Sequence, residues 1–108
     1  MIRESTKYLI EKAINDELQY TLHRKPLFHS DHEAYAVLLE EWDELEEEID
    51  HAAMCIDYLW TWIKEEDPDE ILAWKQDMHH AIKDLIAEAV QVAAMLEKFS
   101  VREGEKNE

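Results

Sequence analysis

The stretch EEDPD at residues 65–69 lies between two long segments with helical periodicity and decides the fold. Pro68 cannot continue a preceding helix, because it lacks a backbone donor and its ring clashes with the previous turn, and a flanking aspartate can cap the next helix. Apolar residues recur at helical spacing over residues 31–64 and again over residues 69–100. If the two helices fold back on each other, residues equally distant from position 66 lie side by side. The stretch therefore predicts a long antiparallel helical hairpin.

A shorter N-terminal helix is predicted before the hairpin, over residues 5–22. Ser30 and Glu33 have the S-x-x-E form of a capping box, which marks the start of the second helix. One Gly and two Pro in 108 residues leave little to break regular structure, and hydrophobic residues make up 46% of the chain. We therefore predict a single all-α domain over residues 1–108, with a frayed, charged tail from residue 101 onward.

The size and charge of the chain limit its partners. A chain of 108 residues is near the lower limit for a core of its own, so we expect a second copy to complete a four-helix-type bundle. The net charge of −16 argues against binding nucleic acid, which relies on basic side chains. No apolar run approaches the length of a membrane span, and Met1 to Thr6 lack the apolar core of a signal peptide. We expect a cytoplasmic protein without membrane contact.

Two acidic clusters lie at matched distances from the turn. Glu44 pairs with Glu88, and Glu41 pairs with Gln91, because the midpoint of both pairs is residue 66. Oxygen ligands alone favour a hard cation such as Mg²⁺ or Mn²⁺, which can bridge protein carboxylates to the phosphates of a substrate. The alternative is a solvated acidic face, since the whole neighbourhood of the first cluster is acidic.

Three segments of the chain carry a resemblance to a known family. LLEEWDEL at 38–45 and EAVQVAA at 88–94, together with the lead-in HSDHEAYA at 29–36, resemble the MazG-like all-α nucleoside triphosphate pyrophosphohydrolases. The signature of that family is an E-x-x-E helix paired with an E-x-x-D helix around Mg²⁺. The resemblance implies dimers or dimers of dimers, and therefore a homodimer or homotetramer here.

By this resemblance, Glu41, Glu44 and Glu88 would be the catalytic magnesium ligands, and Gln91 would stand where the family has an aspartate. The implied reaction is hydrolysis of a nucleoside or deoxynucleoside triphosphate to the monophosphate and pyrophosphate. An amide brings one neutral oxygen and no charge to the metal. The chain could therefore instead be a non-catalytic helical interaction module that has lost activity.

A second metal hypothesis uses histidines. Glu48-x-x-His51 and Asp77-x-x-His80 lie near one level of the hairpin, and Glu-x-x-His pairs on facing helices coordinate the metals of di-iron bundles. Such a protein would be an oxidase or a metal store. Cys55 is the only cysteine, so it predicts neither an internal disulfide nor a cysteine-based metal site, and a buried thiol is expected.

The apolar stripe of the second helix is expected to be buried along the hairpin. It includes Ile49, Ile56 and Ile63, and Trp42 is expected in the seam beside it. Lys98, on the last helix, is expected to be solvated, as most helix lysines are.

Overall fold

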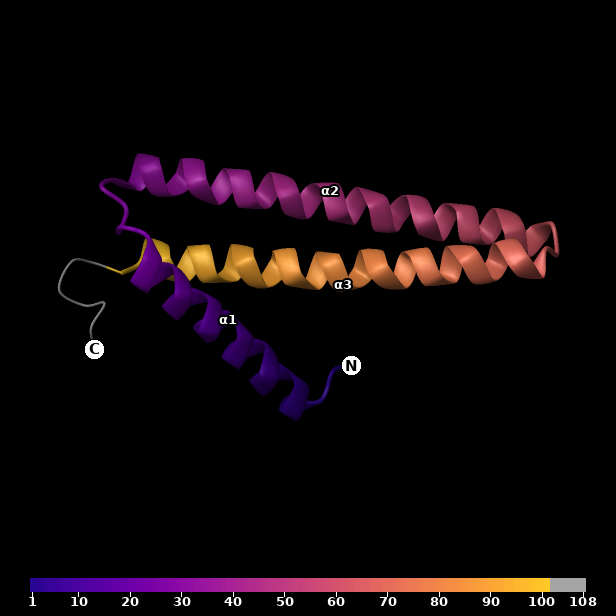
Figure 1. Ribbon diagram of the computed structural model, residues 1–108, viewed down its shortest axis with the longest axis horizontal. Coiled ribbons are helices and arrows are strands. Elements are labelled where there is room, and N and C mark those ends of the chain that lie inside the picture. Colours follow the sequence, from indigo (N-terminus) through magenta and orange to yellow (C-terminus); the bar gives the residue numbers. More distant parts are fainter. Residues whose placement is uncertain (102–108) are drawn as a thin grey trace. The chain divides into compact units, whose positions relative to one another are not determined.

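The structure of the protein is a computed structural model that describes residues 1–101 (Figure 1). It contains three α-helices, which are α1 (Glu4–Arg24), α2 (Asp31–Lys64) and α3 (Pro68–Phe99). No strand occurs within these described residues, so the predicted all-α class is confirmed. Helix α3 begins one residue earlier than predicted, because proline fits the first turn of a helix, where no backbone donor is needed. The predicted frayed tail begins at Val101, which the structure describes as half-buried and packed against the core around Leu18 and Leu22, and residues 102–108 lie outside the described residues.

The start of α2 agrees with the predicted capping box. The Ser30 hydroxyl accepts a hydrogen bond from the backbone N–H of Glu33 at 3.1 Å. The Glu33 carboxylate in turn accepts one from the backbone N–H of His29, also at 3.1 Å. This donor is one residue before the one that a standard box uses, but the result is the same: free backbone donors at the helix start are satisfied.

The turn between α2 and α3 is a Schellman motif. The backbone N–H of Asp67 donates to the carbonyl of Trp62, and that of Glu66 donates to the carbonyl of Ile63. Glu66 has a φ of 56°, a left-handed conformation that glycine adopts more readily. The Asp67 side chain then caps α3 by accepting from the backbone N–H of Glu70 at 3.1 Å. The turn thus ends one helix and starts the next within three residues.

Backbone contacts divide the chain into two compact units. The terminal unit comprises residues 1–42 and the described residues from 89 onward, and the central unit comprises residues 43–88. The core of the terminal unit consists of Leu18, Leu22 and Ala94, with Ile14, Leu27 and Val101 packed against it. This core joins α1 to the last part of α3.

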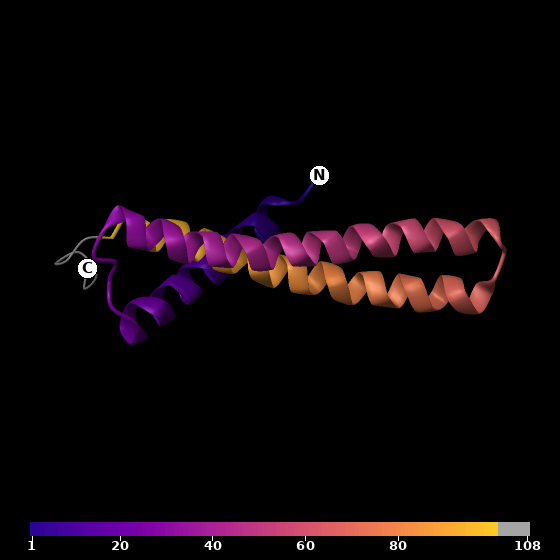
Figure 2. The same ribbon diagram turned by 90° about the horizontal axis from the view of Figure 1, so that it is seen from above.

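In the central unit, the later part of α2 lies beside the earlier part of α3 in two perpendicular views (Figures 1 and 2). The Tyr58 and Trp74 rings stack with centroids 4.7 Å apart and planes 12° apart. The Cys55 thiol donates to the Asp77 carboxylate at 3.4 Å. Both pairs have their midpoint at residue 66. Within this unit, α2 and α3 therefore pair in the register that the position of the turn predicts.

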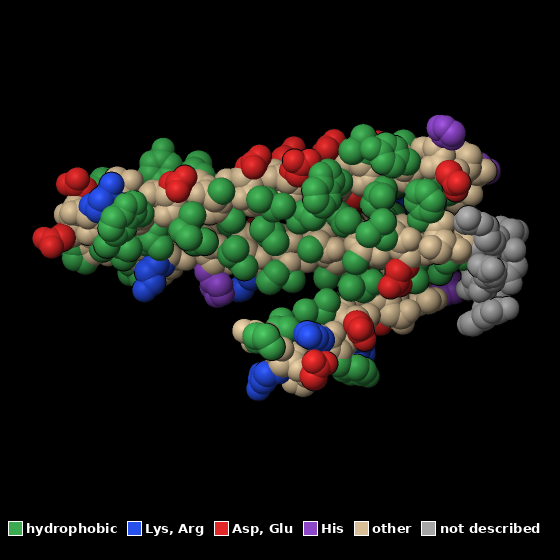
Figure 3. Space-filling model, turned by 180° about the vertical axis from the view of Figure 1, so that it is seen from behind, with side chains coloured by type: hydrophobic (Ala, Val, Ile, Leu, Met, Phe, Trp, Pro, Cys, Tyr) green, Lys and Arg blue, Asp and Glu red, His purple; other side chains and the backbone are tan. Residues whose placement is uncertain are grey.

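Small side chains are the most deeply buried ones in the central unit. Cys55 and Ala81 are fully buried and Ala52 nearly so. Four larger side chains of α2 that were expected to be buried are more than 40% exposed: Ile49, Ile56, Ile63 and Trp42. Figure 3 likewise shows many hydrophobic side chains at the surface. The predicted burial of the apolar stripe was therefore wrong for these four residues, whereas Leu45 and Ala52 on the same helix are each 7% exposed.

None of the helices within residues 1–101 combines the length and apolar character needed to cross a membrane.

Candidate metal centre

Two of the predicted ligands, Glu44 of α2 and Glu88 of α3, lie side by side in the structure. Their side chains share a hydrogen bond, and each offers a carboxylate oxygen within 4.8 Å of the other. Glu44 is exposed and Glu88 is half-buried, so the pair lies at the edge of the helix seam. Both residues belong to the central unit. The count from the turn therefore predicted this pair correctly.

Burial and neighbouring carboxylates both act on the pKa of Glu88. Burial raises the pKa of Glu88 above its ordinary value of 4.5, and the charge of Glu44 and the hydrogen bond with it raise this pKa further. The carboxylates of Glu48 and Asp84 act in the same direction. A hydrogen bond between two carboxyl groups needs one proton, and the raised pKa assigns that proton to Glu88. A divalent cation can replace the proton and remove the repulsion.

The other two predicted ligands belong to the terminal unit. Glu41 lies one helical turn before Glu44 on α2. Gln91 lies one turn after Glu88 on α3. Both residues are half-buried.

The raised pKa of Glu88 predicts a pH dependence of stability. Without metal, the folded protein keeps a proton on Glu88 that the unfolded chain loses above about pH 4.5. The free energy of unfolding should therefore fall as the pH rises from 4.5 through the folded-state pKa, relative to a Glu88→Gln variant. Urea unfolding in chelator at a series of pH values measures this difference. Glu47→Gln, at an exposed position of α2, is the matched control, and parallel curves for wild type and Glu88→Gln would contradict the prediction.

A second cluster, which sequence analysis did not predict, lies deeper in the central unit. His51, Cys55 and Asp77 each offer a ligand atom within 4.8 Å of the other two. The His51 Nε2 atom lies 3.5 Å from the Asp77 Oδ2 atom, which also accepts the bond from Cys55. The helical spacing of His51 and Cys55 and the equal distance of Cys55 and Asp77 from residue 66 could have indicated it.

The di-iron hypothesis used His51 and Asp77 of this cluster together with Glu48 and His80. In the structure, the His51 imidazole lies 3.5 Å from the Asp77 carboxylate. The charge of Glu48 instead raises the pKa of Glu88, and His80 is exposed. The di-iron site stays a prediction.

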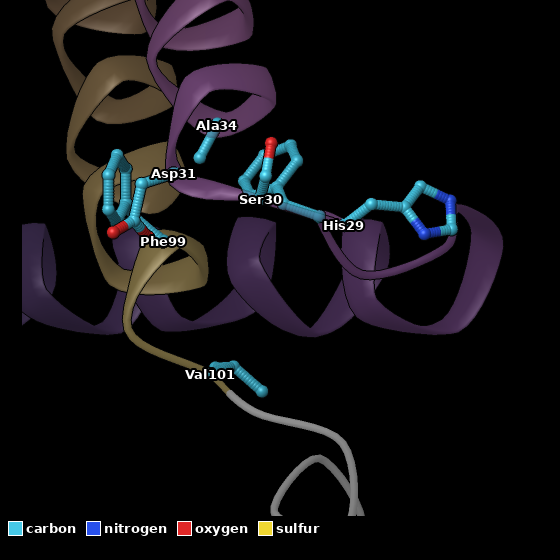
Figure 4. A pocket seen from close by; sticks show the side chains of 7 residues that line it. His29, Ser30, Asp31, Ala34, Phe99 and Val101 are labelled. Atoms are coloured by element: carbon cyan, nitrogen blue, oxygen red, sulfur yellow. The ribbon is translucent and has the colours of Figure 1, made fainter.

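The terminal unit contains a pocket of about 300 Å³ between the α1–α2 loop and the end of α3 (Figure 4). Its lining consists of Phe28, His29, Ser30, Asp31, Ala34, Phe99 and Val101, and includes none of the predicted ligands. The His29 ring points away from the Phe99 ring, so these two side chains do not converge on one ligand.

Lys98 lies close to the lining of this pocket and is 3% exposed, so the expected solvated position was wrong. Its ammonium donates to the Thr21 hydroxyl at 3.3 Å and lies 4.8 Å from the centre of the Phe28 ring. Burial lowers the pKa of Lys98, and the charge of Lys25 lowers it further, against the opposite effect of Glu33. The hydrogen bond to Thr21 and the cation–π contact with Phe28 stabilise the buried ammonium.

The chain matches no protein-family model, no curated protein and no solved structure. The resemblance to MazG-like enzymes therefore stays a prediction that rests on the sequence segments quoted above.

Proposed function

We propose that the protein hydrolyses a nucleoside or deoxynucleoside triphosphate to the monophosphate and pyrophosphate in the presence of Mg²⁺. The observation that carries this proposal is the contact between Glu44 and Glu88, with the raised pKa of Glu88. A divalent cation would remove the repulsion between these two carboxylates, which belong to a chain with a net charge of −16, and their oxygen atoms fit a hard ion. Mg²⁺ would neutralise the triphosphate and polarise its phosphoryl oxygens.

The proposal assigns a role in cation binding to each of the four predicted ligands. Glu44 and Glu88 would hold the cation from two helices, Glu41 would add a third carboxylate from the preceding turn of α2, and Gln91 would contribute its carbonyl oxygen. In the reaction, water attacks the α phosphorus, the bond to the β-phosphate oxygen breaks, and pyrophosphate leaves. One proton passes to the solvent or to a neighbouring carboxylate.

We further propose that the antiparallel hairpin extends along the whole of α2 and α3 and that a second copy completes a four-helix bundle. The exposed apolar side chains of the central unit support this proposal, since burial of apolar area favours association. They include Ile49, Met54, Ile56, Tyr58, Trp60, Ile63, Leu72 and Ile86. Light scattering at several protein concentrations measures the mass, and a monomer at every concentration would contradict the bundle.

The test of the proposed activity is the release of pyrophosphate from a panel of ribo- and deoxynucleoside triphosphates with Mg²⁺ or Mn²⁺. We expect release that depends on the metal and produces the monophosphate in equal amount. If the protein releases no pyrophosphate from any nucleotide of the panel and binds neither Mg²⁺ nor Mn²⁺, the proposal is wrong and the chain is a non-catalytic interaction module. A product that contains orthophosphate instead of pyrophosphate would also contradict the proposal, because it places the cleavage at the terminal phosphate.

The Gln91→Asp variant tests the fourth ligand. A carboxylate at this position adds a negative charge where the proposal has a neutral amide, so we expect Mg²⁺ to bind at least about tenfold more tightly. Gln76→Asp adds the same charge at an exposed position of α3 and is the matched control. Equal Mg²⁺ affinities of the two variants would place Gln91 away from the cation.

A further inference from the structure

The second cluster of the central unit combines three different kinds of ligand atom. His51 and Cys55 are one turn apart on α2, and Asp77 reaches them from α3. Cys55 is fully buried, whereas the His51 and Asp77 side chains are 40% and 47% exposed. The thiol therefore forms the floor of the cluster, and the imidazole and the carboxylate border the solvent from which an ion would enter.

The distances between these atoms fit a tetrahedral ion. Bonds of about 2.0–2.3 Å to nitrogen, oxygen and sulfur place the ligand atoms around a tetrahedral zinc roughly 3.3–3.7 Å apart. The distance from His51 Nε2 to Asp77 Oδ2 is 3.5 Å, and that from Cys55 Sγ to the same oxygen is 3.4 Å. The ligand atoms of His51 and Cys55 lie within 4.8 Å of each other, which limits the movement needed to coordinate an ion.

The chemistry of the ligands selects the kind of ion. Thiolate and imidazole bind borderline or soft ions such as Zn²⁺ in preference to Mg²⁺. Deprotonated Cys55 and Asp77 bring two negative charges, which a divalent ion balances. Burial raises the pKa of the Cys55 thiol, and Asp77 raises it further. Because the thiolate is the form that binds a metal, coordination by Cys55 releases the thiol proton.

We propose that His51, Cys55 and Asp77 form a binding site for a thiophilic divalent ion such as Zn²⁺, with the fourth coordination position open to solvent. This site is separate from the proposed magnesium ligands and does not depend on the hydrolase activity. It differs from the sequence-based expectation for Cys55, which took the thiol as a buried apolar group only.

The test is a Co²⁺ titration of the full chain without a histidine tag. Co²⁺ replaces Zn²⁺ in tetrahedral sites, and a thiolate ligand gives it a charge-transfer absorption band in addition to the visible bands. We expect one equivalent to bind with this band, Zn²⁺ to displace it, and excess Mg²⁺ to leave it unchanged. Absence of the band at a large excess of Co²⁺ over protein would overturn the proposal.

Three variants and two controls assign the ligands. Cys55→Ser should abolish the charge-transfer band, and Asp77→Asn and His51→Gln should each weaken Co²⁺ binding by at least about tenfold. His80→Gln and Glu47→Gln should bind like the wild type, because neither residue belongs to this cluster or to the proposed magnesium ligands. If the buried Cys55→Ser variant does not fold, Asp77→Asn decides, since Asp77 is partly exposed. Wild-type affinity in a folded Asp77→Asn protein would refute the site.

Discussion

The Glu88→Ala variant is expected to lose Mg²⁺-dependent release of pyrophosphate by about 100-fold or more. The estimate follows from the 10- to 100-fold cost of removing groups that only orient a metal ligand, since loss of the ligand itself costs at least as much. Glu88 is the half-buried member of the contact with Glu44, and it supplies the α3 carboxylate of the proposed site. Initial rates at saturating nucleotide and Mg²⁺ measure the effect.

The expected loss of activity can be distinguished from loss of the fold. Removal of Glu88 also removes the repulsion that raises its pKa, so the metal-free variant should be at least as stable as the wild type at neutral pH. Glu47→Ala, an exposed position on α2, should keep wild-type activity. A folded Glu88→Ala protein with activity within about threefold of wild type would remove Glu88 from the catalytic site.

The Leu22→Ala variant is expected to lower the free energy of unfolding by about 2–5 kcal/mol. Leu22 is 8% exposed and packs with Leu18 and Ala94, so truncation leaves a cavity between α1 and the end of α3. Because small domains are stable by only about 5–15 kcal/mol, this is a large part of the total. Urea unfolding followed by circular dichroism measures the change.

Leu9→Ala on the same helix is the matched control, because Leu9 is 60% exposed and its truncation should cost less than about 0.5 kcal/mol. Equal losses for Leu22→Ala and Leu9→Ala would mean that the terminal unit does not pack through Leu22.

Local signals in the sequence predicted the helices well. Helix α2 begins at Asp31 and ends at Lys64 as predicted, since its start depends on Ser30 and its end on the turn before Pro68. The contact between Glu44 and Glu88 was predicted for a similar reason. It needs only the position of the turn and the constant rise of a helix.

The burial of a side chain depends on which side chains pack against it from the other helices. The periodicity of one helix does not predict those partners. Ile49 and Ile56 were expected in the seam and are exposed, whereas Cys55 and Ala81 are buried there. Lys98 is buried because a hydroxyl and an aromatic ring from distant positions surround its ammonium. The cluster around Asp77 was missed because each of its ligands was considered on its own helix or as a lone cysteine.

The spacing of the two clusters in the central unit has a consequence for their thermodynamics. Eleven residues separate Glu44 from Cys55, and eleven separate Asp77 from Glu88, which is close to three full helical turns. The two clusters therefore occur on the same side of the paired helices, about 16 Å apart. This is roughly twice the screening length at physiological ionic strength, so an ion at one position changes the affinity of the other very little. Calorimetric heats for Mg²⁺ and Zn²⁺ should be additive, whichever ion is added first.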